Sequence, residues 1–299
     1  MSARGLAAAP VTWGVWERTV DRDDLVPPES LLDAVRELGF TAIELGPPGY
    51  FGADGASVRE ELGRFGLELV GAFVPLRLTA DELRFDEDLV ELARTLAILA
   101  DQPAAVALLA DAGTPELFAV AGRPAELHRT TLRGADLDAA ARRLAQAAER
   151  CRDAGVTAAL HPEVGSFVES PDEIETFLER VELGLCLDTG HTLIGGADPV
   201  ALARKWADRI RHVHLKDVSS DQLARLRAGE VDVETAWEQG LFCPFGEGEV
   251  DLAGILAELR SYDGWLVVEQ DRIAVRIEDV ETVREAERRN LAFVRERTA

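Results

Sequence analysis

The hydrophobic residues of this chain form short apolar runs that alternate with longer segments of helical periodicity. The apolar runs predict strands at residues 10–15, 41–45, 67–74, 104–109, 156–160, 185–187, 210–215 and 265–268. Apolar positions three or four residues apart predict helices at residues 30–38, 57–65, 88–100, 137–154, 171–181, 199–207, 252–259 and 278–297. Glycine follows three of these helices, at Gly39, Gly66 and Gly155, where it favours a helix end.

This alternation predicts the fold class. The predicted strands lack a polar face, which is typical of a parallel sheet covered by helices. Eight strand–helix units are the number found in a closed (β/α)₈ TIM barrel, and residues 1–299 are long enough for one such domain. An open doubly wound sheet would need a Gly-rich phosphate loop after the first strand, where TWGVWE offers one glycine. We therefore predict a single α/β barrel, in which segment 110–133 is either a lid or a decorated loop.

Composition and charge narrow the class of partner. The formal net charge of −23 disfavours nucleic acid, whose phosphates attract basic surfaces. No apolar run approaches the roughly 18–20 residues that span a bilayer, and no secretory signal is evident. Three cysteines, Cys151, Cys186 and Cys243, at unrelated spacings indicate a reducing compartment. We expect a cytoplasmic protein that contacts neither nucleic acid nor membrane, and a homo-oligomer stays open.

Polar residues end or follow most of the predicted strands. They are Glu44, Arg77, His161, Glu163, Asp188, His191, His212, His214, Lys216 and Glu269, and only His128 among the five histidines falls elsewhere, in segment 110–133. In a TIM barrel, the active site lies at these carboxyl ends. An imidazole and several carboxylates at one point suit a divalent cation such as Mn²⁺, Co²⁺ or Mg²⁺. Without a cation, the crowded carboxylates would repel one another.

Each of these residues also has a purely structural interpretation. Glu44 could pair with Arg77, and His212 is more easily explained as a satisfied core histidine than as a ligand. Glu163 and Glu169 could lie on the surface. The convergence of Asp188, His214 and Glu269 is the part of the pattern that most favours a metal site.

Five motifs, HPEVGSFVE, LCLDTGHTLIGG, IRHVHLKDV, GEGEVD and LVVEQD, occur in this order over most of the chain. Together with WGVWE and GFTAIELGPPGYFG, they resemble the sugar isomerase/epimerase family of xylose isomerase-like barrels, and within it the inosose dehydratase branch. The resemblance implies one divalent ion, most simply Mn²⁺, held by Asp188, His214 and Glu269. The strand-five ligand is usually glutamate; here that position is His161, with Glu163 two residues on, and either could complete the set.

The same resemblance implies a metal-dependent lyase that dehydrates a cyclic polyol ketone. Glu163 and His191 are then the candidate base and acid, and Lys216 would hold a substrate oxygen. Three residues would orient the small-molecule substrate from the opposite wall, namely Trp13, Glu44 and Arg77.

Other functions of the superfamily stay open to different degrees. The alternatives are a keto-sugar isomerase or epimerase, an enzyme that cleaves a 3-keto glycoside, and a binding subunit without catalytic activity. The intact Asp188, His214 and Glu269 set argues against the last of these. A DNA-repair endonuclease of this superfamily would need extra histidines on strands one to four, which the sequence lacks.

Overall fold

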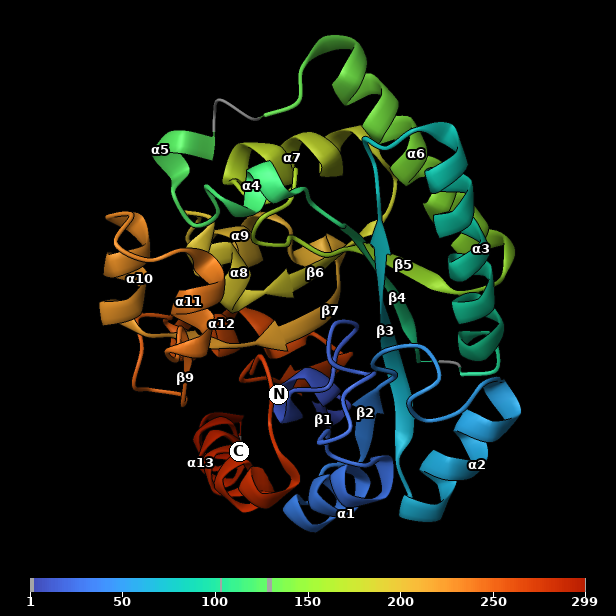
Figure 1. Ribbon diagram of the computed structural model, residues 1–299, viewed down its shortest axis with the longest axis vertical. Coiled ribbons are helices and arrows are strands. Elements are labelled where there is room, and N and C mark those ends of the chain that lie inside the picture. The colour runs from blue at the N-terminus through green and yellow to red at the C-terminus, as the bar shows by residue number, and fades with distance from the viewer. Residues whose placement is uncertain (1–2, 103, 128–130, 299) are drawn as a thin grey trace.

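The computed structural model describes residues 3–102, 104–127 and 131–298, and its centre is a closed barrel of eight parallel strands (Figure 1). The barrel strands are β1 (Gly5–Ala8), β2 (Ala42–Glu44), β3 (Glu68–Leu76), β4 (Val106–Asp111), β5 (Thr157–Leu160), β6 (Gly184–Asp188), β7 (Ile210–Leu215) and β10 (Trp265–Val268). Neighbouring strands pair in the order β1-β10-β7-β6-β5-β4-β3-β2. Two short strands, β8 (Asp217–Val218) and β9 (Phe242–Cys243), form a separate antiparallel pair.

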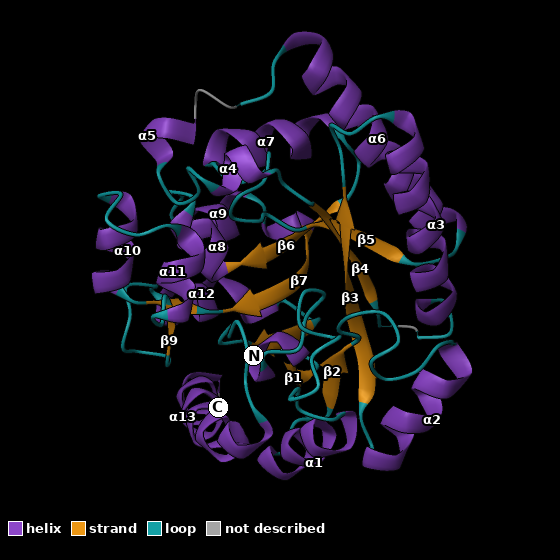
Figure 2. Ribbon diagram, viewed as in Figure 1, coloured by secondary structure: helices purple, strands orange, loops and turns teal. Residues whose placement is uncertain are grey.

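Helices surround these strands on the outside (Figure 2). They are α1 (Pro28–Leu38), α2 (Gly55–Phe65), α3 (Glu82–Leu99), α4 (Pro115–Phe118), α5 (Pro124–Leu127), α6 (Gly134–Asp153), α7 (Pro171–Arg180), α8 (Thr189–Ile194), α9 (Pro199–Lys205), α10 (Ser220–Arg227), α11 (Val233–Glu238), α12 (Leu252–Glu258) and α13 (Val280–Thr298), with 3₁₀ turns η1 (Pro10–Trp13), η2 (Ala207–Arg209), η3 (Leu259–Ser261) and η4 (Ile277–Asp279). The predicted (β/α)₈ fold is confirmed. Among the described residues, no helix combines the length and apolar character needed to cross a membrane.

The prediction for the first strand is wrong. Residues 10–15 do not form a strand, because Pro10 begins the 3₁₀ turn η1 and Gly14 ends it with a left-handed φ of 68°. The first strand is instead β1, whose small residues give a weak strand signal. Gly5 in β1 lies against the ring of Trp265, where a Cβ would be 2.7 Å from the nearest ring carbon. Close packing between β1 and β10 thus determines the position of the first strand, which the local pattern of apolar residues does not predict.

Several other predicted boundaries move. Pro75 does not end β3, which pairs with β4 through Leu76. Helix α3 begins six residues earlier than residue 88, because the Asp81 side chain caps it by accepting from Arg84 N. Segment 110–133 contains the short helices α4 and α5. The segment after β6 is helix α8 and not a loop, and the hairpin β8–β9 with α10 and α11 was not predicted.

The hydrophobic core has an outer and an inner part. A large cluster includes residues from the helices and strands, such as Leu31, Leu92 and Leu144. A small cluster on β4, β5 and β6 includes Cys186, which shares its strand face with Asp188 two residues later. The inner face of the barrel thus changes from apolar to charged toward the carboxyl ends of the strands.

Asp217 stabilises the loop that follows the β8–β9 hairpin. The side chain is fully buried, and it accepts hydrogen bonds from the backbone nitrogens of Val218, Gly246, Gly248 and Val250 at 2.9, 2.8, 3.0 and 3.1 Å. A Cβ on Gly248 would overlap the carboxylate. One aspartate thus organises a turn that would otherwise contain several unpaired buried donors.

Replacing Asp217 with alanine should therefore destabilise the protein strongly. Hydrogen bonds to a charged group are worth about 1.5–3 kcal/mol each, so we expect a loss of about 3 kcal/mol or more. Urea unfolding monitored by circular dichroism would measure it. Asp263→Ala, at an exposed position, is the control and should change stability by less than about 0.5 kcal/mol. Equal stability of the two variants would contradict this role for Asp217.

Glu287 is a second fully buried carboxyl, on α13. Asn290 Nδ2 donates to its Oε1 at 2.8 Å, and Oε2 has no hydrogen-bond partner. Burial raises the pKa of Glu287 from 4.5 to about 8, although Asn290 and Arg272 oppose the rise. The folded protein therefore holds a proton on Glu287 near neutral pH that the unfolded chain would release.

This raised pKa predicts that stability falls as the pH rises from 4.5 to about 8. Below pH 4.5 both states are protonated, and above about 8 both are ionised, so the loss is confined to this window. Glu287→Gln should remove this component, and the stability difference between parent and variant should change by about 5 kcal/mol across it. Urea unfolding of both proteins at pH 5, 6, 7 and 8 tests this; parallel curves would contradict it.

Candidate functional site

A cavity of about 670 Å³ opens at the carboxyl ends of the barrel strands. Its polar lining includes Glu44, His161, Glu163, His214 and Glu269, each at or just after the end of a strand. Its apolar lining includes aromatic side chains from the segments that follow the barrel strands, namely Trp16, Phe118, Trp237 and Phe242. The arrangement is that of a small-molecule site with few polar groups set in an apolar wall.

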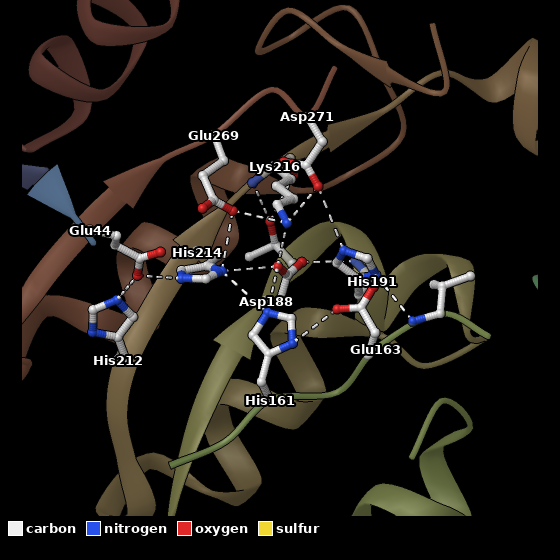
Figure 3. Close-up of polar contacts among 12 residues, drawn as sticks. Glu44, His161, Glu163, Asp188, His191, His212, His214, Lys216, Glu269 and Asp271 are labelled. Atoms are coloured by element: carbon white, nitrogen blue, oxygen red, sulfur yellow. Dashed lines mark hydrogen bonds and ion pairs between the residues drawn. The ribbon is translucent and has the colours of Figure 1, made fainter. Parts of the chain in front are cut away.

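Four side chains from four successive strand ends meet at the base of this cavity (Figure 3). His214 Nδ1 lies 3.3 Å from Asp188 Oδ2 and 3.2 Å from Glu269 Oε2. His161 Nε2 lies 3.4 Å from Asp188 Oδ2 and 3.3 Å from His214 Nδ1. All four residues are at most 2% exposed. The structure thus brings together the predicted set and places His161, not Glu163, beside the other three.

Four contacts among these atoms match the spacing of ligands around a divalent ion. Ligands at ~2.1 Å from an ion in tetrahedral geometry lie about 3.4 Å apart, close to the observed 3.2–3.4 Å. Asp188 Oδ2 and Glu269 Oε2 are buried and both face His214 Nδ1, and a buried carboxylate is costly unless it is paired with a cation. Asp188, His214 and Glu269 form one of three candidate metal-binding groups among the described residues.

Lys216, two residues after His214 on the chain, is the cation closest to these carboxylates. Its Nζ lies 2.9 Å from each of Asp188 Oδ2, Glu269 Oε2 and Asp271 Oδ2. Burial alone would lower the pKa of Lys216, but the three carboxylates outweigh burial and hold it well above its ordinary value. The same ammonium group helps to keep the pKa of Asp188 well below its usual range, against the effect of burial.

A second row of side chains lies beside this cluster. Glu163 is a quarter exposed, and its Oε2 and Oε1 lie 3.3 Å from His161 Nδ1 and 3.5 Å from His191 Nδ1. Val164 N donates to His191 Nδ1 at 3.2 Å, which leaves the proton of a neutral ring on Nε2, 3.7 Å from Asp271. Burial would raise the pKa of Glu163, but the nearby histidines and Lys216 lower it. Glu163 is therefore an ionised carboxylate at the cavity surface.

Helix α8 holds His191 in this row. Its first turn is capped by Asp188, whose Oδ1 accepts from His191 N at 2.8 Å. Gly190, next to His191, has no room for a side chain, because a Cβ would lie 2.8 Å from Lys216 Cβ. The DTGH motif is therefore a capped helix start that places two functional candidates side by side.

Glu44 contacts the opposite side of the cluster. Its Oε1 accepts from His212 Nε2 at 2.7 Å and from His214 Nε2 at 2.9 Å (Figure 3). His212 is thus a buried histidine with a partner, as its structural interpretation had it, and the pairing of Glu44 with Arg77 does not occur. Glu44 also lines the cavity, so the geometry leaves its predicted contact with substrate untested.

Two residues predicted to bind substrate do not line the cavity. Arg77 follows β3 but turns outward, where its Nη2 lies 2.6 Å from Asp88 Oδ1 and 3.1 Å from Glu87 Oε2. Trp13 is fully buried in the hydrophobic core because the η1 turn directs it inward. The predicted orienting roles of Arg77 and Trp13 therefore have no support in the geometry. His128 lies outside the described residues.

The sequence did not identify Asp271, Trp16 or Trp237 as site residues. Asp271 is 6% exposed and contacts Lys216. It lies two residues after Glu269, and this spacing places both side chains on the same side of an extended segment, which could have identified Asp271 from the sequence. Trp16 and Trp237 pack with ring centroids 5.2 Å apart, and Arg18 pairs with Glu234 beside them at 2.8 Å. Residues over 200 positions apart thus build one wall, which local patterns cannot show.

Comparison with known proteins finds the same architecture. A family model described as xylose isomerase-like TIM barrel matches residues 32–295. Inosose dehydratase from Geobacillus kaustophilus (strain HTA426) is 32% identical over 272 residues, which cover 89% of this chain and 87% of that protein. The structure of L-ribulose 3-epimerase aligns with a TM-score of 0.69 at 18% identity, covering 98% of this chain and 94% of that one. The IOLI protein, solved with a bound zinc atom, aligns with a TM-score of 0.69 at 14% identity, covering 98% of each.

The position of Lys216 predicts a large effect on stability when no metal is bound. Lys216→Met would leave three buried carboxylates without their cation, and breaking such a buried pair costs about 3–5 kcal/mol. Lys205→Met is the matched control, since Lys205 is the other lysine of the chain and is half exposed beside Glu175. Urea unfolding of chelator-treated proteins would measure both. A Lys216 variant as stable as the Lys205 variant would contradict this charge balance.

Proposed function

This chain belongs to the xylose isomerase-like TIM-barrel family and is a sugar-modifying enzyme of that family, and we propose that it removes water from a cyclic polyol ketone. The observation that carries the proposal is the convergence of His161, Asp188, His214 and Glu269 within 3.2–3.4 Å contacts at the base of the cavity. The relative named inosose dehydratase, similar over 89% of this chain, supports the same class of reaction.

The four converging side chains would hold one divalent metal ion. Two imidazoles and two carboxylates suit Mn²⁺, with Co²⁺ and Mg²⁺ as the alternatives. The IOLI protein, which has a similar fold, was solved with a bound zinc atom, and this supports a divalent ion in the present chain. A bound ion would supply Lewis-acid polarisation of the substrate ketone, which makes the adjacent C–H bond acidic. Asp188 Oδ2 and Glu269 Oε2 both face His214 Nδ1, which supports the assignment of these two carboxylates as ligands.

Glu163 and His191 would move the protons of the elimination. Glu163 faces the cavity next to the cluster and would accept the proton from the carbon α to the ketone. Burial would lower the pKa of His191, but Glu163 and Asp188 raise it above its ordinary value. The protonated ring, with Nε2 near Asp271, would donate the proton with which the β-hydroxyl leaves as water. The C–H bond and the C–O bond break, and a C=C bond forms between the two carbons. Each proton transfer typically contributes about 10²–10⁴-fold to the rate.

Lys216 and the aromatic wall would bind and orient the ring. The three carboxylates around Lys216 keep it charged, so it can donate to a ketone or hydroxyl oxygen while Asp271 holds the ammonium in place. Trp16, Trp237 and Phe242 offer apolar faces to the C–H bonds of a cyclic polyol. A cavity of about 670 Å³ accommodates a six-membered ring with its hydroxyls.

One observation favours a second candidate, a keto-sugar epimerase. Glu163 and Glu269 both line the cavity and come from different strands, and two acid–base groups on opposite faces of a carbon are what epimerisation needs. Glu269 Oε2 is directed at His214 and Lys216, which favours a ligand over a free base. We therefore rank dehydration first.

Incubation with keto-inositols and keto-sugars plus Mn²⁺ in heavy water distinguishes the two candidates by mass spectrometry. Dehydration gives a product lighter by one water, whereas epimerisation returns an isomer with deuterium at the reactive carbon. Glu163→Gln should retain metal and lower the rate about 10²–10⁴-fold. Asp188→Ala should lose both metal and activity. A metal-loaded parent that leaves every cyclic ketone unchanged would contradict the proposal.

A further inference from the structure

Glu44 and His212 form a buried pair on the side of His214 that faces away from Asp188 and Glu269 (Figure 3). Glu44 Oε1 lies 2.7 Å from His212 Nε2 and 2.9 Å from His214 Nε2. Glu44, His212 and His214 are 5%, 1% and 2% exposed. We propose that Glu44, itself held by His212, is the positioning residue that orients His214 for metal binding. The inference rests on the proposed function, because it presupposes a bound ion.

The two nitrogens of His214 have different partners. His214 Nε2 donates to Glu44, and Nδ1 faces Asp188 Oδ2 and Glu269 Oε2. A metal-ligating histidine commonly donates its other ring N–H to a carboxylate, which fixes the ring and makes the ligating nitrogen more basic. Glu44 meets this requirement for His214 from β2, across the barrel from β7. It therefore acts through the imidazole and does not touch the ion.

The backbone around Glu44 provides the space for this contact. The β2–β3 register shifts between Ile43 and Glu44, and such an irregularity redirects the side chain that follows it. On β3, a Cβ at Gly71 would lie 3.2 Å from both Glu44 Oε1 and His212 Cε1. That contact is tighter than an alanine would ordinarily make, so glycine leaves room for the pair.

A contact with substrate alone would not explain this arrangement. One oxygen of Glu44 accepts hydrogen bonds from two imidazoles at once, so His212 restrains the carboxylate that in turn restrains His214. The pair lies beneath the cluster and is drawn from two strands that are not neighbours. A role directed at His214 uses both histidines, the register shift and the glycine together.

Glu44→Gln is the decisive variant, because it keeps the size of the side chain and removes its charge. We expect the Kd for Mn²⁺, measured by titration calorimetry on protein stripped with chelator, to rise about 10–100-fold. Glu17→Gln is the matched control: Glu17 is an exposed acid at the mouth of the same cavity, without a contact to His214. It should change the Kd by no more than about twofold, because no hydrogen bond or ion pair joins Glu17 to the four candidate ligands.

Gly71→Ala provides an independent test that alters no charge. It should also weaken Mn²⁺ binding, by crowding Glu44 and His212, and it stands in for Glu44→Gln if that variant does not fold by circular dichroism. A folded Glu44→Gln or Gly71→Ala protein that binds Mn²⁺ as tightly as the parent would overturn the positioning role. A parent that binds no divalent ion would instead contradict the metal site of the proposed function, so the two failures are distinguishable.

Discussion

Compensation of buried negative charge is the constraint on which the whole site depends. Asp188, Glu269 and Asp271 are each at most 6% exposed and all lie around Lys216 (Figure 3). Carboxylates removed from water are costly unless cations or hydrogen-bond donors surround them. In this barrel, Lys216 follows β7, whereas the three carboxylates lie at the ends of β6 and β10. Strand order and register are therefore conditions for charge balance at the site as well as for packing.

The sequence predicted those parts of the fold that local patterns determine. The bounds of β7 and β10 were predicted residue by residue, because each is a compact run with clear flanking signals. The strand β1 was missed, since glycine and alanine give little local preference and its place depends on packing against Trp265. Helix α8 is absent from the predicted helices because its glycines outweigh the cap that Asp188 provides.

The site could be predicted in part for the same reason. Asp188, His214 and Glu269 end strands that the apolar pattern located, and parallel strand ends meet at one edge of a barrel. The direction of Arg77 depends on Asp88, a helix residue that competes for its guanidinium. The contact of Glu44 with His212 depends on pairing across the barrel and on a register shift. Neither has a signal along the chain, since both are set by neighbours distant in sequence.

The Asp188 carboxylate has two separate tasks, one for each oxygen. Oδ2 faces His161, His214 and Lys216, while Oδ1 accepts from the backbone nitrogen of His191. The spacing between the base of the cavity and the His191 ring is therefore set by a single helical turn and not by the packing of independent loops. The mouth of the cavity is built from other segments, those around Trp16 and Trp237. Substitutions there can change the shape of the mouth without changing the distance between Asp188 and His191.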